Sequence, residues 1–231
     1  MRKIFLIAML SLLGTVCAAC ITITIRTQQL PLPVVKTATS TPSPTLTPTI
    51  TPTPQPTPTP TLSPQRIFDE FVNRVKTGES GRVVGIYTEN LMALPVIYQP
   101  SNNPAFVSNE DGIVTYFLLP WRLARNHGFL AHNYLSGALF YYLQIGDIVQ
   151  VIYGDGNYED FEVLSIRQFQ ALIPNSSRTS LVDLETGAKL SVTTVFNEVY
   201  RGEYHSTLQT CLAQDGLDNW GRYFVLAPPL Y

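Results

Sequence analysis

The sequence predicts an all-β domain, a closed barrel of seven or eight strands with a short peripheral helix, preceded by an export segment and a linker. Three observations predict this fold. Val, Ile, Thr and Tyr dominate the second half of the 231-residue chain, and these residue types favour strands. Apolar runs of strand length recur after residue 78. Gly154-Asp155-Gly156-Asn157 separates two of these runs and is a strong hairpin signal.

Residues 1–25 have the pattern of a signal peptide or membrane anchor. Met1-Arg2-Lys3 is basic and is followed by the apolar run Ile4–Val16 and by Cys17-Ala18-Ala19-Cys20. Three outcomes stay open: cleavage with lipidation of Cys20, a retained anchor over the uncharged segment Ile4–Ile25, and simple cleavage after Ala18 or Ala19. Each outcome predicts an extracytoplasmic protein, and the first two tether it to the outer face of the cytoplasmic membrane.

Residues 26–65 are predicted to be an extracytoplasmic linker. Thr37–Pro64 consists almost entirely of Thr, Pro and Ser, a composition that builds no core and favours polyproline II. At about 3.1 Å per residue this tract would reach roughly 90 Å. The folded domain is then expected over residues 66–231.

Within that domain the elements can be taken in order. Ile67–Val75 has apolar residues at helical spacing, with Pro64 near its start and Gly78 just past its end, which predicts one short helix. The segments that follow have the composition and length of strands. The expected strands are Val83–Tyr87, Ile113–Leu118, Phe129–His132, Ile148–Tyr153, Tyr158–Ile166, Lys189–Phe196, Ser206–Cys211 and Tyr223–Ala227.

Cys211 is the only cysteine of the expected domain, so an internal disulfide is excluded there. It ends a predicted strand, and the loop Leu212–Gly221 would return the chain so that Arg222 lies beside it. A thiol next to a fixed cation is a sound nucleophile site. The alternative is that Cys211 is a small buried core residue.

A thiol nucleophile needs a base, and the domain offers His127, His132 and His205. His205 precedes Cys211 by six residues, which is about 20 Å of extended chain, too far to serve it. His127 lies in a loop before a strand. His132 ends an apolar strand and projects into a turn, which makes it the candidate base.

Three segments resemble the sortase family. Ala131-His132-Asn133, Gly137–Phe140, Leu143 and Gly146–Val149 are similar to the sortase histidine segment. Thr207-Leu208-Gln209-Thr210-Cys211 matches the family's Thr-Leu-x-Thr-Cys signature, and Arg222–Leu226 is similar to its arginine strand. The resemblance covers roughly residues 82–227; Ala131 stands where many sortases carry Gly.

This resemblance implies a β-barrel cysteine transpeptidase without a cofactor. Cys211 would attack the carbonyl of a C-terminal sorting motif in surface proteins and form a thioacyl enzyme. His132 would act as acid and base, Arg222 would stabilise the oxyanion, and Thr210 would contact the substrate. The acyl group would pass to an amine acceptor, a cell-wall peptide or a pilin lysine. Hydrolysis without transfer stays open.

Other functions fit less well. A net charge of −2 and a pI near 5.9 argue against a nucleic-acid partner. The order His before Cys is opposite to that of papain-like proteases, and the residues after Cys211 do not match a cysteine L,D-transpeptidase. Zinc-ligand spacing is absent and no metal is expected; the carboxylates of Asp147, Asp155, Asp160 and Glu162 would be calcium ligands or simply solvated.

The main alternative comes from another class of protein. A stalked, non-catalytic β-barrel that binds surface ligands would carry the same export segment and linker. Only the set of His132, Cys211 and Arg222 argues against it. The two functions therefore differ on whether the Cys211 thiol is activated.

Overall fold

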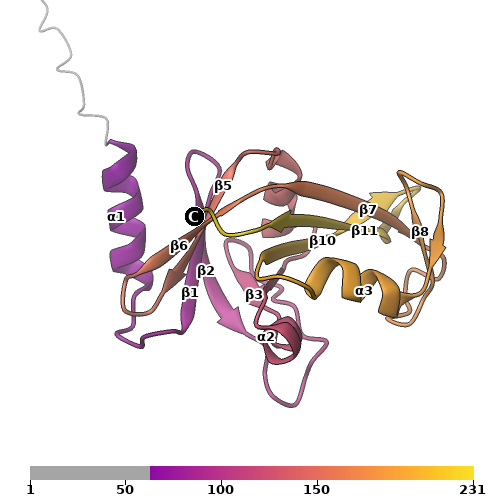
Figure 1. Ribbon diagram of the computed structural model, residues 1–231, viewed down its shortest axis with the longest axis horizontal. Coiled ribbons are helices and arrows are strands. Elements are labelled where there is room, and N and C mark those ends of the chain that lie inside the picture. Colours follow the sequence, from indigo (N-terminus) through magenta and orange to yellow (C-terminus); the bar gives the residue numbers. More distant parts are fainter. Residues whose placement is uncertain (1–62) are drawn as a thin grey trace, which may run out of the picture. The chain divides into compact units, whose positions relative to one another are not determined.

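The computed structural model describes residues 63–231, and the strands of this part form one sheet in the order β6-β5-β1-β2-β3-β4-β10-β11-β7-β8-β9 (Figure 1). The strands are β1 (Val83–Thr88), β2 (Met92–Tyr98), β3 (Val114–Tyr116), β4 (His127–Leu130), β5 (Ile148–Tyr153), β6 (Tyr158–Glu162), β7 (Ser165–Ala171), β8 (Leu181–Asp183), β9 (Lys189–Leu190), β10 (Ser206–Gln214) and β11 (Leu217–Ala227). The helices are α1 (Pro64–Val75), α2 (Leu118–Ala124), the 3-10 helix η1 (Ser136–Tyr142) and α3 (Val192–Tyr200).

The predicted signal or anchor segment 1–25, the lipidation candidate Cys20 and nearly all of the linker 26–65 lie outside the described residues. Among residues 63–231, no helix has the length and apolar character that crossing a bilayer requires.

The all-β class is confirmed, but the prediction of a closed barrel of seven or eight strands is wrong. The described sheet has eleven strands and is open, with β6 and β9 at its two ends. The segment after β11 curls back toward β6, where Phe161 and Pro229 form an isolated bridge and the Glu162 N–H donates to the Pro228 carbonyl (3.0 Å). The Leu230 N–H also donates to the Asp160 carbonyl (2.8 Å), but the segment after β11 forms no further strand with β6, so the sheet bends round a core without closing.

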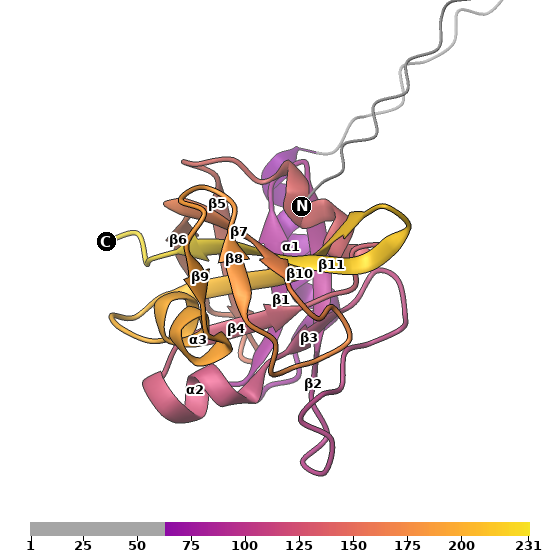
Figure 2. The ribbon, with the colours of Figure 1, turned by 90° about the vertical axis from the view of Figure 1, so that its right-hand side faces the viewer.

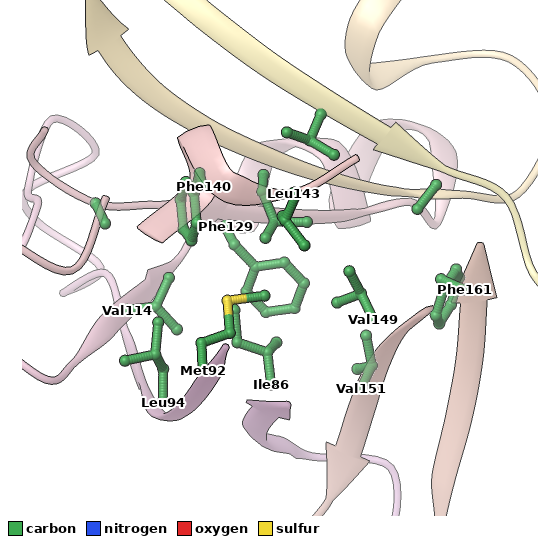
Figure 3. Close-up of a cluster of buried hydrophobic side chains, with 14 of the residues drawn as sticks. Ile86, Met92, Leu94, Val114, Phe129, Phe140, Leu143, Val149, Val151 and Phe161 are labelled. Atoms are coloured by element: carbon green, nitrogen blue, oxygen red, sulfur yellow. The ribbon is translucent and has the colours of Figure 1, made fainter. Parts of the chain in front are cut away.

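The main core lies inside that bend (Figure 3). It is built from side chains that alternate inward along the strands, together with residues of η1 and the segment after it. Fully buried members include Ile86, Phe129, Phe140, Val149 and Phe161. Burial of each such side chain contributes about 1.5–3 kcal/mol, which makes this core the dominant source of stability.

Two helices cover other surfaces of the sheet (Figure 1). The predicted helix is confirmed as α1, which begins at Pro64 with Ser63 as its N-cap. Phe71 of α1 packs so closely on β1 that a Cβ on Gly85 would lie 3.1 Å from its ring. α3 places Val195 and Val199 against a second apolar cluster of the sheet.

The expected strand Lys189–Phe196 is wrong. Only Lys189 and Leu190 form a strand, β9, and the chain then enters α3. The Ser191 hydroxyl accepts the Thr194 N–H (3.0 Å), which caps the helix. The Val and Thr residues of this segment favour strands locally, but burial of Val195 and Val199 four residues apart stabilises a helix.

Other boundaries also differ from the predictions. The segment Tyr158–Ile166 contains β6 and the start of β7, and β2, which has Pro95 in its middle, was not among the expected strands. The hairpin turn at Gly154–Asn157 is confirmed, since Ile152 pairs with Tyr158 and the Tyr153 N–H donates to the Asn157 carbonyl (2.8 Å).

His127 is buried at the start of β4, among aromatic side chains. Its Nδ1 lies 2.8 Å from the Tyr116 hydroxyl, and its Nε2 lies 2.9 Å from the Tyr204 hydroxyl. The Trp121 ring stacks on it with centroids 5.4 Å apart. Burial, with a smaller contribution from the charge of His205, lowers the pKa of His127 to about 4.

We predict that His127 destabilises the fold as the pH falls from about 6.5 to about 4. In that range the unfolded chain binds a proton on this side chain and the folded chain does not, which costs about 3 kcal/mol of unfolding free energy at the acid end. An NMR titration of the His127 ring would read its pKa directly. Titration near pH 6.5 in the folded protein would contradict this prediction.

Candidate functional site

Strand β10, which carries Cys211, lies between β4 and β11 (Figure 2). It runs antiparallel to β11, and in that register Cys211 pairs directly with Arg222. The expectation that Arg222 returns beside Cys211 is confirmed. The expected loop Leu212–Gly221 is wrong, because both strands continue to a tight turn at Asp215-Gly216, where both residues have positive φ.

His132 follows β4, the other strand that pairs with β10. β4 runs parallel to β10 and pairs Leu130 with Gln209. The Ala131 N–H donates to the Gln209 carbonyl (3.2 Å), which extends the pairing past the end of β4. β4 ends at Leu130, so His132 follows its last paired residue by two positions, on the chain that leaves the strand next to β10. Arg222 is the direct cross-strand neighbour of Cys211.

The backbone around His132 is held by several contacts. Its carbonyl accepts the Leu135 and Gly137 N–H groups, each at 3.0 Å. Asn133 Nδ2 donates to the Asp218 carbonyl (2.8 Å) and so joins the histidine turn to β11. The Tyr134 ring stacks on the imidazole, with centroids 5.1 Å apart and planes 13° apart.

Gly137 explains why a glycine follows the histidine. A Cβ at this position would lie 2.7 Å from both the Ala131 and His132 carbonyl oxygens and would meet the Thr210 hydroxyl as well. No side chain fits there without displacing the histidine turn. The glycine therefore allows β4, η1 and β10 to meet behind the site.

Thr210 lies on the core side of β10, because neighbouring residues in a strand face opposite sides. Its side chain is buried, and its hydroxyl donates to the Ala131 carbonyl (2.9 Å). The expected contact of Thr210 with substrate stays a prediction. Its observed contact holds the segment before His132 against β10.

The Arg222 guanidinium is fixed by backbone carbonyls. Nη1 donates to Asn219 (2.9 Å) and Gly221 (2.8 Å), and Nη2 donates to Pro174 (3.2 Å). Within residues 63–231, no carboxylate forms an ion pair with it. Its orientation is thus set by neutral groups, and its positive charge stays uncompensated.

Arg222 also lines a cavity of about 350 Å³ on the outer face of the sheet. Gln209 and Phe224, which share a sheet face with Cys211 and Arg222 by alternation, form part of its floor. Tyr200 of α3 donates its hydroxyl to Gln209 Oε1 (2.5 Å). The predominantly apolar lining and the nearby fixed cation make this cavity suitable for an extended peptide segment.

Three effects act on the pKa of the Cys211 thiol, and they do not all have the same sign. Burial raises its pKa and is the largest effect, the positive charge of Arg222 lowers the pKa, and the negative charge of Asp218 raises it. The net effect is a pKa above the usual range. In this structure the resting side chain is therefore a neutral thiol at pH 7, and attack requires transfer of its proton to a base.

Tyr141 was not identified from the sequence. Its hydroxyl donates to the Cys211 carbonyl, and its ring packs edge-on against Tyr223 with centroids 5.0 Å apart. Burial raises the pKa of Tyr141, so it stays a neutral donor. No sequence signal marks it, since η1 was not predicted.

The remaining candidates lie elsewhere. His127 and His205 are both buried near the start of β10, at the opposite end from Cys211. Asp155 and Asp160 accept hydrogen bonds from Asn157 and Gln150. In the part of the chain that the structure describes, no group of three or more His, Cys, Asp or Glu side chains is arranged to hold a metal ion.

We predict that Asp218→Asn and Arg222→Ala move the reactivity of Cys211 in opposite directions. Removing the negative charge lowers the thiol pKa and speeds alkylation at pH 7, whereas removing the positive charge raises the pKa and slows it, each on the order of twofold. Iodoacetamide labelling of the Cys211 peptide, read by mass spectrometry, separates this thiol from Cys17 and Cys20. Equal rates in both variants would contradict the assigned electrostatics.

Of three comparisons with known proteins, only the one with solved structures finds matches. No protein-family model and no curated protein sequence matches the chain. Solved structures similar to it include a lid mutant of Streptococcus agalactiae sortase C1 (16% identity, 69% of this chain and 73% of that chain, TM-score 0.41). Listeria monocytogenes sortase A (12%, 64% and 88%, 0.38) and Actinomyces oris sortase C-1 (16%, 75% and 83%, 0.41) are also similar. At such low identities and TM-scores, these likenesses assign no residue and no activity to this chain.

Proposed function

We propose that this protein is a sortase-type cysteine transpeptidase that cleaves a sorting motif in surface proteins and transfers the acyl group to an amine. One observation carries the proposal: Cys211 on β10 pairs directly with Arg222 on β11, and His132 follows β4, the other neighbour of β10, by two residues. The order of the motifs in the sequence supports the same set of residues.

The reaction would proceed in two halves. In the first, the Cys211 thiol transfers its proton to His132 and the sulfur adds to the backbone carbonyl of the motif. The tetrahedral oxyanion forms near the uncompensated charge of Arg222, which stabilises it. His132 then protonates the leaving amine, the C–N bond breaks, and a thioester remains on Cys211.

The second half reverses these roles. His132 removes a proton from the incoming amine, which attacks the thioester carbonyl and forms a new amide. The sulfur departs and regains a proton, so the enzyme returns to its resting state. The apolar cavity next to Arg222 would bind the residues of the motif that precede the reacting carbonyl.

The proposal includes the cellular setting that the sequence indicates. Residues 1–25 would export the chain or anchor it, with Cys20 as the lipidation site if the segment is a lipoprotein signal. Residues 26–65 would be a spacer that holds the catalytic domain 66–231 away from the outer face of the cytoplasmic membrane. Substrates would be surface proteins with a C-terminal sorting motif, and acceptors would be cell-wall peptides or pilin lysines.

The test is a transfer assay with the full-length protein. A pool of peptides with Leu-Pro-x-Thr-Gly-like sequences is incubated with triglycine, and joined products are identified by mass spectrometry. We expect a joined product from wild type and none from Cys211→Ala, whose melting temperature stays nearly unchanged. If wild type gives no cleavage and Cys211 reacts with reagents only after unfolding, the non-catalytic binding module is the better account.

We further predict that Arg222→Lys loses at least about tenfold in transfer rate. The lysine ammonium group has a single nitrogen and lacks the rigid, planar set of N–H donors of a guanidinium. It therefore cannot keep the three carbonyl contacts and still hold a fixed charge near the oxyanion. Arg201→Lys, at the exposed end of α3, is the matched control and should retain full activity. Full activity of Arg222→Lys would remove Arg222 from the mechanism.

A further inference from the structure

A second hollow lies at the other end of β10 from Cys211. It consists of two adjoining cavities of about 580 Å³ and 330 Å³, which share Ser80, Gly81 and Trp121 in their walls. Tyr204, which lines the larger cavity, precedes Cys211 by seven residues, or about 23 Å of extended chain. The hollow is therefore separate from the candidate catalytic site.

Aromatic rings form much of the larger cavity. Trp121 comes from α2, Tyr153 and Tyr158 from the β5–β6 hairpin, and Tyr204 from the segment before β10. Tyr158 is 47% exposed although it is a large ring on a folded surface. His127 stacks on the Trp121 ring, and Arg125 also lies over that ring. Tyr158 is therefore the ring that offers an exposed apolar face for the C–H groups of a ligand.

Donors and acceptors can be assigned in the hydrogen bonds between the buried His127 and the tyrosines that line the two cavities. The Tyr204 hydroxyl donates to Glu159 Oε2 (2.6 Å), so its oxygen accepts from His127 Nε2–H (2.9 Å). The Nδ1 atom then accepts from the Tyr116 hydroxyl (2.8 Å). Tyr153 Oη also lies near Nε2 (3.2 Å), so the Tyr153 hydroxyl belongs to the same hydrogen-bond network.

Charges of both signs border the hollow. The Arg125 guanidinium lies over Trp121, 5.2 Å from the ring centroid, whereas Glu159 and Asp155 present carboxylates from β6 and its turn. The positive charge of Arg125 would repel a cationic ligand, and the two carboxylates would repel an anionic ligand. A neutral ligand with many hydroxyl groups can donate to the carboxylates and to the Tyr153 oxygen and accept from the guanidinium.

We propose that this hollow binds a neutral saccharide of one or two rings. The cavity volume is within the usual range for small-ligand sites. The Tyr158 ring packs against a C–H face of the sugar, and Arg125, Tyr153 and Glu159 bond its hydroxyls. The saccharide site does not depend on the proposed transpeptidase activity, since it needs neither Cys211 nor a sorting motif.

The test measures binding to the full-length protein by titration calorimetry, in buffer without sugar-based detergents and without any sorting peptide. The probes are cellobiose and N,N′-diacetylchitobiose, with glucosamine and glucuronate as charged comparisons. We expect saturable binding of at least one neutral disaccharide with a Kd on the order of 1 mM, and weaker binding of both charged sugars. No saturation by either disaccharide, or tighter binding of a charged sugar, would overturn the proposal.

Variants locate the binding site. Tyr153→Phe removes one hydroxyl and Glu159→Gln removes one charge, so each should weaken binding by about threefold or more. Glu162→Gln is the control, because this residue lies on the same strand but does not line the hollow. Equal weakening in Glu162→Gln, or unchanged binding in both hollow variants, would show that the sugar binds elsewhere.

Discussion

The pairing of β10 with two different neighbours is the constraint on which the candidate site depends. Its antiparallel register with β11 sets Cys211 opposite Arg222, and its parallel register with β4 fixes the strand that leads into His132. A shift of one residue in either pairing would turn these side chains to the other face of the sheet. The register is held by the buried side chain of Leu208 and by the bond from Thr210 to Ala131, both on the core face.

The sequence could predict features that depend on local chemistry. The turn Gly154–Asn157 carries residues that tolerate positive φ, and Pro64 and Gly78 bracket α1. The juxtaposition of Cys211 and Arg222 followed from the prediction of two paired strands connected by a loop that reverses the chain. His132 was picked out because a polar residue was expected to end an apolar strand, but β4 ends two residues earlier, at Leu130, and the role of His132 stays a prediction.

The features that were missed depend on contacts between distant segments. α3 has a strand-like composition and becomes helical because Val195 and Val199 bury against the sheet. Tyr141 reaches Cys211 only because η1 packs under β10, and the tie from Asn133 to Asp218 joins residues 85 positions apart. The closed barrel was wrong for a similar reason: closure depends on how β6 and the segment after β11 meet, which periodicity within one strand does not encode.

The central claim is that Cys211 is a nucleophile, although burial raises the pKa of its thiol. The most direct measurement is the intact mass of the full-length protein after mixing with a sorting-peptide pool and rapid acid quenching. The account predicts an added acyl mass that maps to Cys211 and that hydroxylamine removes. Absence of any adduct from peptides that bind the protein, or an adduct only on Cys17 or Cys20, would contradict it.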